Sequence, residues 1–189
     1  MVDKAAVFID GGYFVKVREY FGLYRINFAA FSDLLCGDYE RLFTFYYDAP
    51  PFLSNPPTTD EKTKQANFDR FTYSLRLHPR FQVRLGKLSR LNKDCPKCGY
   101  SSVVYKQKRV DNLLTVDLTR AIWKDNIRKA ILVTGDSDFV PAVEEANRAQ
   151  ILTHVYYLKA GNTGIHDELY MACSERTQIT KELLEKARF

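Results

Sequence analysis

The hydrophobic positions of the chain form short apolar runs that alternate with longer segments of helical spacing. Each run is short enough for a buried strand, and each longer segment repeats its apolar residues every three or four positions. The runs predict strands over 5–9, 42–47, 81–85, 130–133 and 151–158. The intervening spacing predicts helices over 13–20, 27–35, 60–77, 110–124, 139–149 and 165–172, with a short one near 183–187. This alternation is typical of an α/β fold, with a parallel sheet covered by helices on both faces.

One segment, residues 86–108, departs from the alternation and predicts a β-hairpin insertion. Its arms are expected at 87–91 and 101–107, and its tip reads Cys95-Pro96-Lys97-Cys98-Gly99. We find no internal repeat, low-complexity tract or second domain. We therefore expect one domain over residues 1–189, with the hairpin inserted in it.

The hairpin tip has the spacing of half a zinc site, because C-x-x-C-G can direct two sulfurs at one metal ion. Cys95 and Cys98 would supply two ligands, and structural zinc usually takes four. Cys36, Cys173, His78 or a second copy of the chain are candidates for the others, and the last choice predicts a homodimer. The alternatives are a knuckle without metal or a reactive dithiol.

The net charge of +5 is unevenly distributed. Residues 76–109 contain ten Lys or Arg and one acid, a local charge of +9, whereas the rest of the chain carries −4. A solvated surface could explain such a run, but this density favours a polyanionic partner such as RNA. The expected nucleic-acid contacts are Lys87, Arg90, Lys97, Lys106, Lys108 and Arg109.

Two predicted strands end in aspartate, which is the strongest chemical signal in the chain. Asp10 follows the first strand and precedes Gly11-Gly12, and Asp136 and Asp138 follow the strand that ends at Val133. In open α/β sheets, ligands bind at the carboxyl edge, where these side chains would lie. The alternative is that the aspartates only cap the helices that follow.

The helix predicted over 110–124 carries two further acids. Asp111 lies in its first turn, where it could simply favour the helix dipole. Asp117 falls within an otherwise apolar stripe, and a buried carboxylate is costly unless it is paired, hydrogen-bonded or bound to metal. We treat Asp111 as a site residue and Asp117 as a possible one, with a hydrogen bond to a neighbouring loop as the alternative for Asp117.

If the two aspartate-ended strands are neighbours, Asp10, Asp111, Asp136 and Asp138 can form an acidic cup. Crowded carboxylates repel one another, and a hard divalent cation such as Mg²⁺ or Mn²⁺ would relieve that repulsion. Such a cation can activate water and stabilise the charge that develops in phosphoryl transfer. Thr134 and Ser137 could orient the aspartates or bind a phosphate oxygen.

These motifs resemble those of the NYN domain, a branch of the PIN-like superfamily of metal-dependent ribonucleases, nearest its LabA-like group. The similar elements are Phe8-Ile9-Asp10-Gly11-Gly12, Lys108-Arg109-Val110-Asp111 with Val116-Asp117-Leu118, and Thr134-Gly135-Asp136-Ser137-Asp138-Phe139. The resemblance implies a three-layer α/β/α sandwich with strand order 3-2-1-4-5 and an Asp-bound Mg²⁺ or Mn²⁺ centre. It also implies Asp10, Asp111 and Asp136 as the catalytic core, with Asp138 in support. Family members often have an asparagine soon after the first aspartate, where this chain has Gly12-Tyr13.

The sequence therefore predicts a metal-dependent endoribonuclease. One alternative is an RNA-binding or regulatory module with little hydrolytic activity, and a second is a phosphatase or nucleotide hydrolase. In the nuclease, the hairpin would follow the RNA backbone, and Tyr100 or Tyr105 could stack on a base. We expect a cytoplasmic protein with no membrane partner, because no apolar run approaches about 20 residues and no signal-peptide pattern is present.

Overall fold

The central element of the fold is a six-stranded parallel sheet with the order β3-β2-β1-β6-β7-β8. The computed structural model describes residues 2–94, 96, 98–160 and 163–189. The strands of the sheet are β1 (Lys4–Asp10), β2 (Glu40–Asp48), β3 (Phe81–Leu85), β6 (Lys129–Val133), β7 (Leu152–Tyr157) and β8 (Glu175–Gln178). β1 and β6 are neighbours and in register, with Ile9 opposite Val133.

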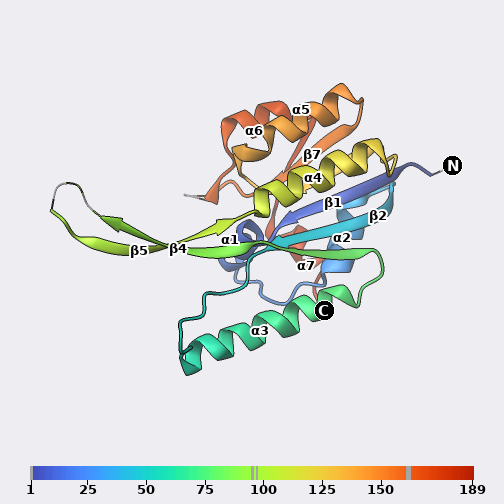
Figure 1. Cartoon of the computed structure of the whole chain (residues 1–189). Coiled ribbons are helices and arrows are strands. Elements are labelled where there is room, and N and C mark those ends of the chain that lie inside the picture. Colours follow the sequence, from blue (N-terminus) through green and yellow to red (C-terminus); the bar gives the residue numbers. More distant parts are fainter. Residues whose placement is uncertain (1, 95, 97, 161–162) are drawn as a thin grey trace.

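Helices cover both faces of the sheet and enclose two separate cores (Figure 1). One core contains residues of α1 (Gly11–Phe21), α2 (Phe28–Cys36), α3 (Thr59–Arg76) and α7 (Lys181–Glu185). The other contains residues of α4 (Val110–Trp123), α5 (Val140–Arg148) and α6 (Asp167–Ala172). β1 serves both because alternate side chains point to opposite faces, so that Val7 joins the first core and Phe8 the second.

Local sequence signals explain where several helices begin. Asn27 caps α2 by accepting a hydrogen bond from the Ala30 N–H, and Thr58 and Glu61 form a reciprocal capping box at the start of α3. A short 3₁₀ turn, η1 (Ser137–Phe139), precedes α5, and Pro141 lies in the first turn of α5, where its missing N–H is tolerated.

The apolar runs predict five strands, and the structure adds a sixth, β8, to the main sheet. Its four residues, Glu175 to Gln178, alternate between exposed and partly exposed, so they lack the apolar signal of a strand. β8 is an edge strand held by its backbone pairing with β7 and by the ion pair from Lys129 Nζ to Glu175 Oε2, at 2.6 Å. Both interactions join residues that are distant in sequence, which is why local periodicity did not predict the strand.

The insertion is a β-hairpin of β4 (Lys87–Asp94) and β5 (Ser101–Lys108), which pair antiparallel as a sheet of their own. It projects from the body on the side to which the strands of the main sheet run (Figure 1). It leaves the sheet after β3 and returns directly to α4, so it belongs to the carboxyl edge. Of the expected zinc knuckle, Cys95 and Lys97 lie outside the described residues, and Cys98 is an exposed free thiol.

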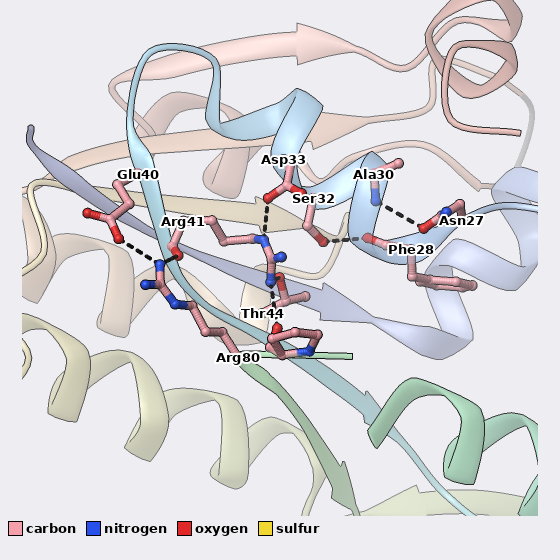
Figure 2. A network of polar contacts seen from close by, with 10 residues as sticks. Asn27, Phe28, Ala30, Ser32, Asp33, Glu40, Arg41, Thr44 and Arg80 are labelled. Atoms are coloured by element: carbon pink, nitrogen blue, oxygen red, sulfur yellow. Dashed lines mark hydrogen bonds and ion pairs between the residues drawn. The ribbon is translucent and has the colours of Figure 1, made fainter. Parts of the chain in front are cut away.

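A network of ion pairs and hydrogen bonds secures the opposite, amino edge of the sheet (Figure 2). Arg41 Nε donates to Asp33 Oδ1 at 2.5 Å and so ties β2 to α2. Arg80 Nη1 donates to Glu40 Oε1 at 2.7 Å and to the Arg41 carbonyl at 2.9 Å, which joins the starts of β2 and β3. Arg41 and Arg80 are thus each paired with an acid of the same chain.

Candidate active site

The first site residue, Asp10, lies where β1 ends and α1 begins. Its Oδ1 accepts a hydrogen bond from the Tyr13 N–H at 3.1 Å, which caps the helix. Gly11 is required beside it, because a Cβ there would lie 2.6 Å from the Tyr46 ring and from the Tyr47 carbonyl oxygen. The local sequence therefore fixes the carboxylate at the edge of the sheet.

The second acidic segment follows β6 through a compact turn. The buried Thr134 accepts a hydrogen bond from the Asp136 N–H at 3.3 Å, and Asp136 Oδ1 accepts one from the Asp138 N–H at 3.0 Å. Asp136, rather than Asp138, is thus the cap of η1. The side chain of Asp138 is exposed.

Thr134 also connects the two strand ends, because its hydroxyl donates to Asp10 Oδ2 at 3.2 Å. Burial raises the pKa of Asp10 above its ordinary value of 3.8, although the hydrogen bonds from Tyr13 and Thr134 lower it. The charges of Asp136 and Asp111 raise that pKa further. In the described part of the chain, neither Asp10 nor Asp136 forms an ion pair, so the repulsion between them is not compensated by a cationic side chain.

The structure distributes the four predicted acids between two cavities. Asp10 and Asp136 line one of about 360 Å³, which we call the α1-side cavity. Asp111 and Asp138 line a second, the α4-side cavity, together with Ser137 and Thr115. The four acids thus line two cavities, and the charges of Asp136 and Asp111, one from each cavity, both raise the pKa of Asp10.

The number of carboxylates in the site decides whether it suits Mg²⁺ or Mn²⁺. Among the described residues, no group of three or more His, Cys, Asp and Glu is arranged to hold a metal ion. Mg²⁺, however, is often bound by one or two carboxylates, with water and substrate phosphate completing its shell. The Asp10–Asp136 pair meets that smaller requirement.

A comparison with protein-family models matches the NYN domain over residues 4–180. The chain belongs to the NYN domain family. NYN domains are typically nucleases, which places this chain, at the coarse level, among the hydrolases. None of the curated proteins compared with the chain matches it.

A solved structure supports the fold of this NYN domain. It is the crystal structure of a protein of unknown function from Vibrio parahaemolyticus RIMD 2210633, similar with a TM-score of 0.60 and 20% sequence identity. The similarity covers 96% of this chain and 95% of that chain. At this identity it shows a shared fold.

Asp117, the possible fifth acid of the NYN domain, is engaged in an internal ion pair. Its two oxygens accept hydrogen bonds from Arg84 Nη2 at 2.8 Å and Nε at 2.9 Å, and Oδ2 also accepts one from the Tyr47 hydroxyl. Asp117 is 5% exposed and lines neither cavity. The ion pair joins α4 to β3 and the Tyr47 hydrogen bond joins it to β2, which explains why a carboxylate occurs in the apolar stripe.

The expected nucleic-acid contacts lie on or beside the hairpin. Lys87 is exposed at the start of β4, and Arg109 is exposed where β5 meets α4, two residues before Asp111. Positions 90, 106 and 108 lie in the two strands, and Lys97 lies outside the described residues. Arg109 has a left-handed φ of 74°, which turns the chain from the hairpin into the helix.

Several polar residues that line the cavities of the NYN domain were not predicted from the sequence, among them Lys16, His166 and Glu168. Lys16 and His166 line the α1-side cavity, and Glu168 lines the α4-side cavity. Lys16 follows Gly12 by one helical turn, so its spacing could have indicated it. His166 and Glu168 come from the segment after β7, and only the tertiary fold brings them to the acids.

No helix in the described part of the chain combines the length and apolar character of a membrane span.

Proposed function

We propose that this NYN domain is a metal-dependent endoribonuclease. The observation that carries the proposal is the pair of carboxylates at the ends of adjacent parallel strands, linked through Thr134 and without an ion-pair partner among the described residues. Like charges so placed are unfavourable, and a divalent cation would relieve them. The family assignment supports the same chemistry.

In this proposal Asp10 and Asp136 hold an Mg²⁺ or Mn²⁺ ion. When bound, the ion supplies charge that lowers the pKa of water and stabilises the phosphate in the transition state. Thr134 orients Asp10 through its hydroxyl, and Asp111 and Asp138 orient the attacking water from the α4 side. Arg109 and the lysines of the hairpin bind the RNA backbone beside Asp111.

The test is cleavage of a labelled RNA with Mn²⁺, with Mg²⁺ and with EDTA. Asp136→Asn removes one carboxylate of the pair and keeps its size, so we expect cleavage to fall by about 100-fold. Asp38→Asn, an exposed aspartate outside both cavities, is the matched control and should cut like wild type. Equal cutting by Asp136→Asn and wild type would contradict the proposal and indicate a contaminating nuclease.

A second candidate is an RNA-binding module with little hydrolytic activity. It is favoured by the lack, among the described residues, of three acids arranged around one metal position. It predicts tight binding that weakens with salt, is unchanged by Asp136→Asn and is not followed by cleavage with either metal.

A further inference from the structure

The α1-side cavity combines two carboxylates with one lysine, and a metal ion held by the carboxylates does not itself require that lysine. Asp10 and Asp136 line it from the sheet edge, Lys16 lines it from α1, and Thr163 and His166 line it from the segment after β7. Its volume of about 360 Å³ lies in the range of small-molecule sites. The cavity therefore has room for part of a nucleotide beside the carboxylates.

Lys16 is exposed, and it forms no ion pair in the described part of the chain. It lies one helical turn after Gly12, and both residues line the cavity. The ammonium group thus shares a cavity with Asp10 and Asp136 without neutralising either. Because Lys16 is not paired with Asp10 or Asp136, its ammonium group remains available to a phosphate of a negatively charged ligand.

The wall opposite α1 is fixed to the site by hydrogen bonds. The His166 N–H donates to the Gly135 carbonyl at 3.0 Å, and the Leu158 N–H donates to the Tyr13 hydroxyl at 2.8 Å. A Cβ on Gly135 would meet the Gly164 carbonyl and approach the Tyr13 ring to 2.7 Å. The segment therefore packs directly on the acidic turn, so Thr163 and His166 line the cavity from a supported position.

The other cationic group lies across the sheet. α1 packs in one core and α4 in the other, so Lys16 and Arg109 approach the carboxyl edge from opposite faces. Asp10 and Asp136 end the two strands between these faces. A nucleic-acid strand that contacts both cations crosses from one face of the sheet to the other, and a path along the carboxyl edge takes it past Asp10 and Asp136.

We propose that the α1-side cavity is a phosphate subsite for the part of the substrate strand that lies beyond the scissile bond. Lys16 binds a phosphodiester there, with His166 and Thr163 beside it, while Arg109 and the hairpin hold the strand on the α4 side. The strand thus continues on both sides of the carboxylates, and the cut is internal. This inference rests on the proposed function for the position of the scissile phosphate.

The experiment pairs a charge reversal with truncation of the substrate. An RNA oligonucleotide with one mapped cut is shortened stepwise from its 5′ end and, separately, from its 3′ end. Wild type, Lys16→Glu and the control Lys62→Glu, an exposed lysine on α3, are compared on each length. Thermal unfolding of all three verifies that they are folded.

On the full-length RNA, we expect Lys16→Glu to raise KM about tenfold with kcat nearly unchanged, because the lost contact binds substrate and transition state alike. Shortening from one end should abolish this difference, and shortening from the other end should preserve it. The end whose removal abolishes the KM difference is the end that reaches Lys16, which gives the polarity of the bound strand. The subsite is disproved if Lys16→Glu matches Lys62→Glu, or if neither truncation changes the effect of Lys16→Glu.

Binding in EDTA separates failure of the subsite from failure of the nuclease. If wild type cuts no RNA, the proposed function fails, and a series of RNAs shortened from each end is measured by fluorescence anisotropy instead. A loss of affinity in Lys16→Glu that disappears on shortening one end still supports the subsite. Equal affinities of Lys16→Glu and Lys62→Glu for every length overturn it.

Discussion

Asp10 combines structural and chemical demands in one side chain. It caps α1 through the Tyr13 N–H and receives the Thr134 hydroxyl, and both hydrogen bonds favour the charged form. Burial, followed by the charges of Asp136 and Asp111, disfavours that form and raises the pKa overall. The ionised carboxylate therefore destabilises the fold, as expected of a group retained for function.

We predict that Asp10→Asn is more stable than wild type at neutral pH, by about 0.5–1 kcal/mol. A raised folded-state pKa means that the native protein binds the proton more tightly than the unfolded chain does. Wild-type stability therefore falls as pH rises from 3.8 through the raised pKa, and this loss is complete above it. Urea unfolding of both proteins across this pH range, without divalent metal, measures the difference.

The asparagine cannot titrate but can still accept the Tyr13 N–H, so the helix cap is kept. Asp38→Asn, which changes an exposed carboxylate, should show no comparable pH-dependent gain. A stability difference between Asp10→Asn and wild type that is constant with pH would refute the electrostatic explanation.

Among the elements, the β4–β5 hairpin has two faces of different character. Its register pairs Lys93 with Ser102, and Lys87 and Lys93 share one face of β4 because they are an even number of residues apart. Tyr105 belongs to the other face, and its ring lies 4.8 Å from that of Phe52 in the loop after β2. Tyr105 thus contacts the body from one face of the hairpin, and Lys87 and Lys93 lie on the other.

We expect the double variant Lys87→Gln and Lys93→Gln to bind RNA more weakly and with less dependence on salt. Each lost contact with a single-stranded phosphate lowers the slope of log K against log salt by about 0.7, so the two together lower it by about 1.4. Filter binding at several salt concentrations gives the slope. Both lysines are exposed, so thermal unfolding should be unchanged.

The matched control for the hairpin is Lys62→Gln with Lys124→Gln, two exposed lysines on α3 and at the end of α4. This variant has the same net charge as the hairpin variant. If both weaken binding equally, the effect is one of overall charge, and the hairpin is not the binding surface.

At the scale of the whole molecule, the two edges of the sheet differ in how their charges are matched. At the amino edge, Arg41 pairs with Asp33 and Arg80 with Glu40 (Figure 2). At the carboxyl edge, Asp10 and Asp136 have no such partner in the described part of the chain. The fold is therefore secured at one end, while the other retains unfavourable charge that a ligand could neutralise.

We predict that Mn²⁺ stabilises the wild-type fold, because a ligand that binds only the native state raises the free energy of unfolding by mass action. At a free Mn²⁺ concentration of 100 times Kd, the gain is about 2.7 kcal/mol. For a domain of this size, each kcal/mol raises Tm by about 2–4 °C. Thermal unfolding with and without Mn²⁺ measures the shift.

The double variant Asp10→Asn with Asp136→Asn should lose the Mn²⁺ shift, whereas Asp38→Asn should keep it. An equal shift in all three proteins would mean that the ion binds elsewhere. No shift in wild type would argue against an Asp-bound cation and favour the RNA-binding module.

The sequence by itself determined the features that depend on neighbouring residues. Apolar runs and helical spacing indicated the α/β architecture and the hairpin, and an aspartate at the end of a strand predicted its place at the sheet edge. Asp10 and Asp136 lie there because each is followed at once by a turn into a helix. Periodicity and capping act over a few residues, so they can be read directly from the chain.

Only the tertiary structure decided which of these side chains meet. It divided the acids between two cavities, paired Asp117 with Arg84 and brought Lys16 and His166 into one cavity. It also added β8, whose pairing with β7 has no apolar signal in the sequence. These outcomes depend on how distant segments pack against each other, and that information is not contained in the local pattern of any one segment.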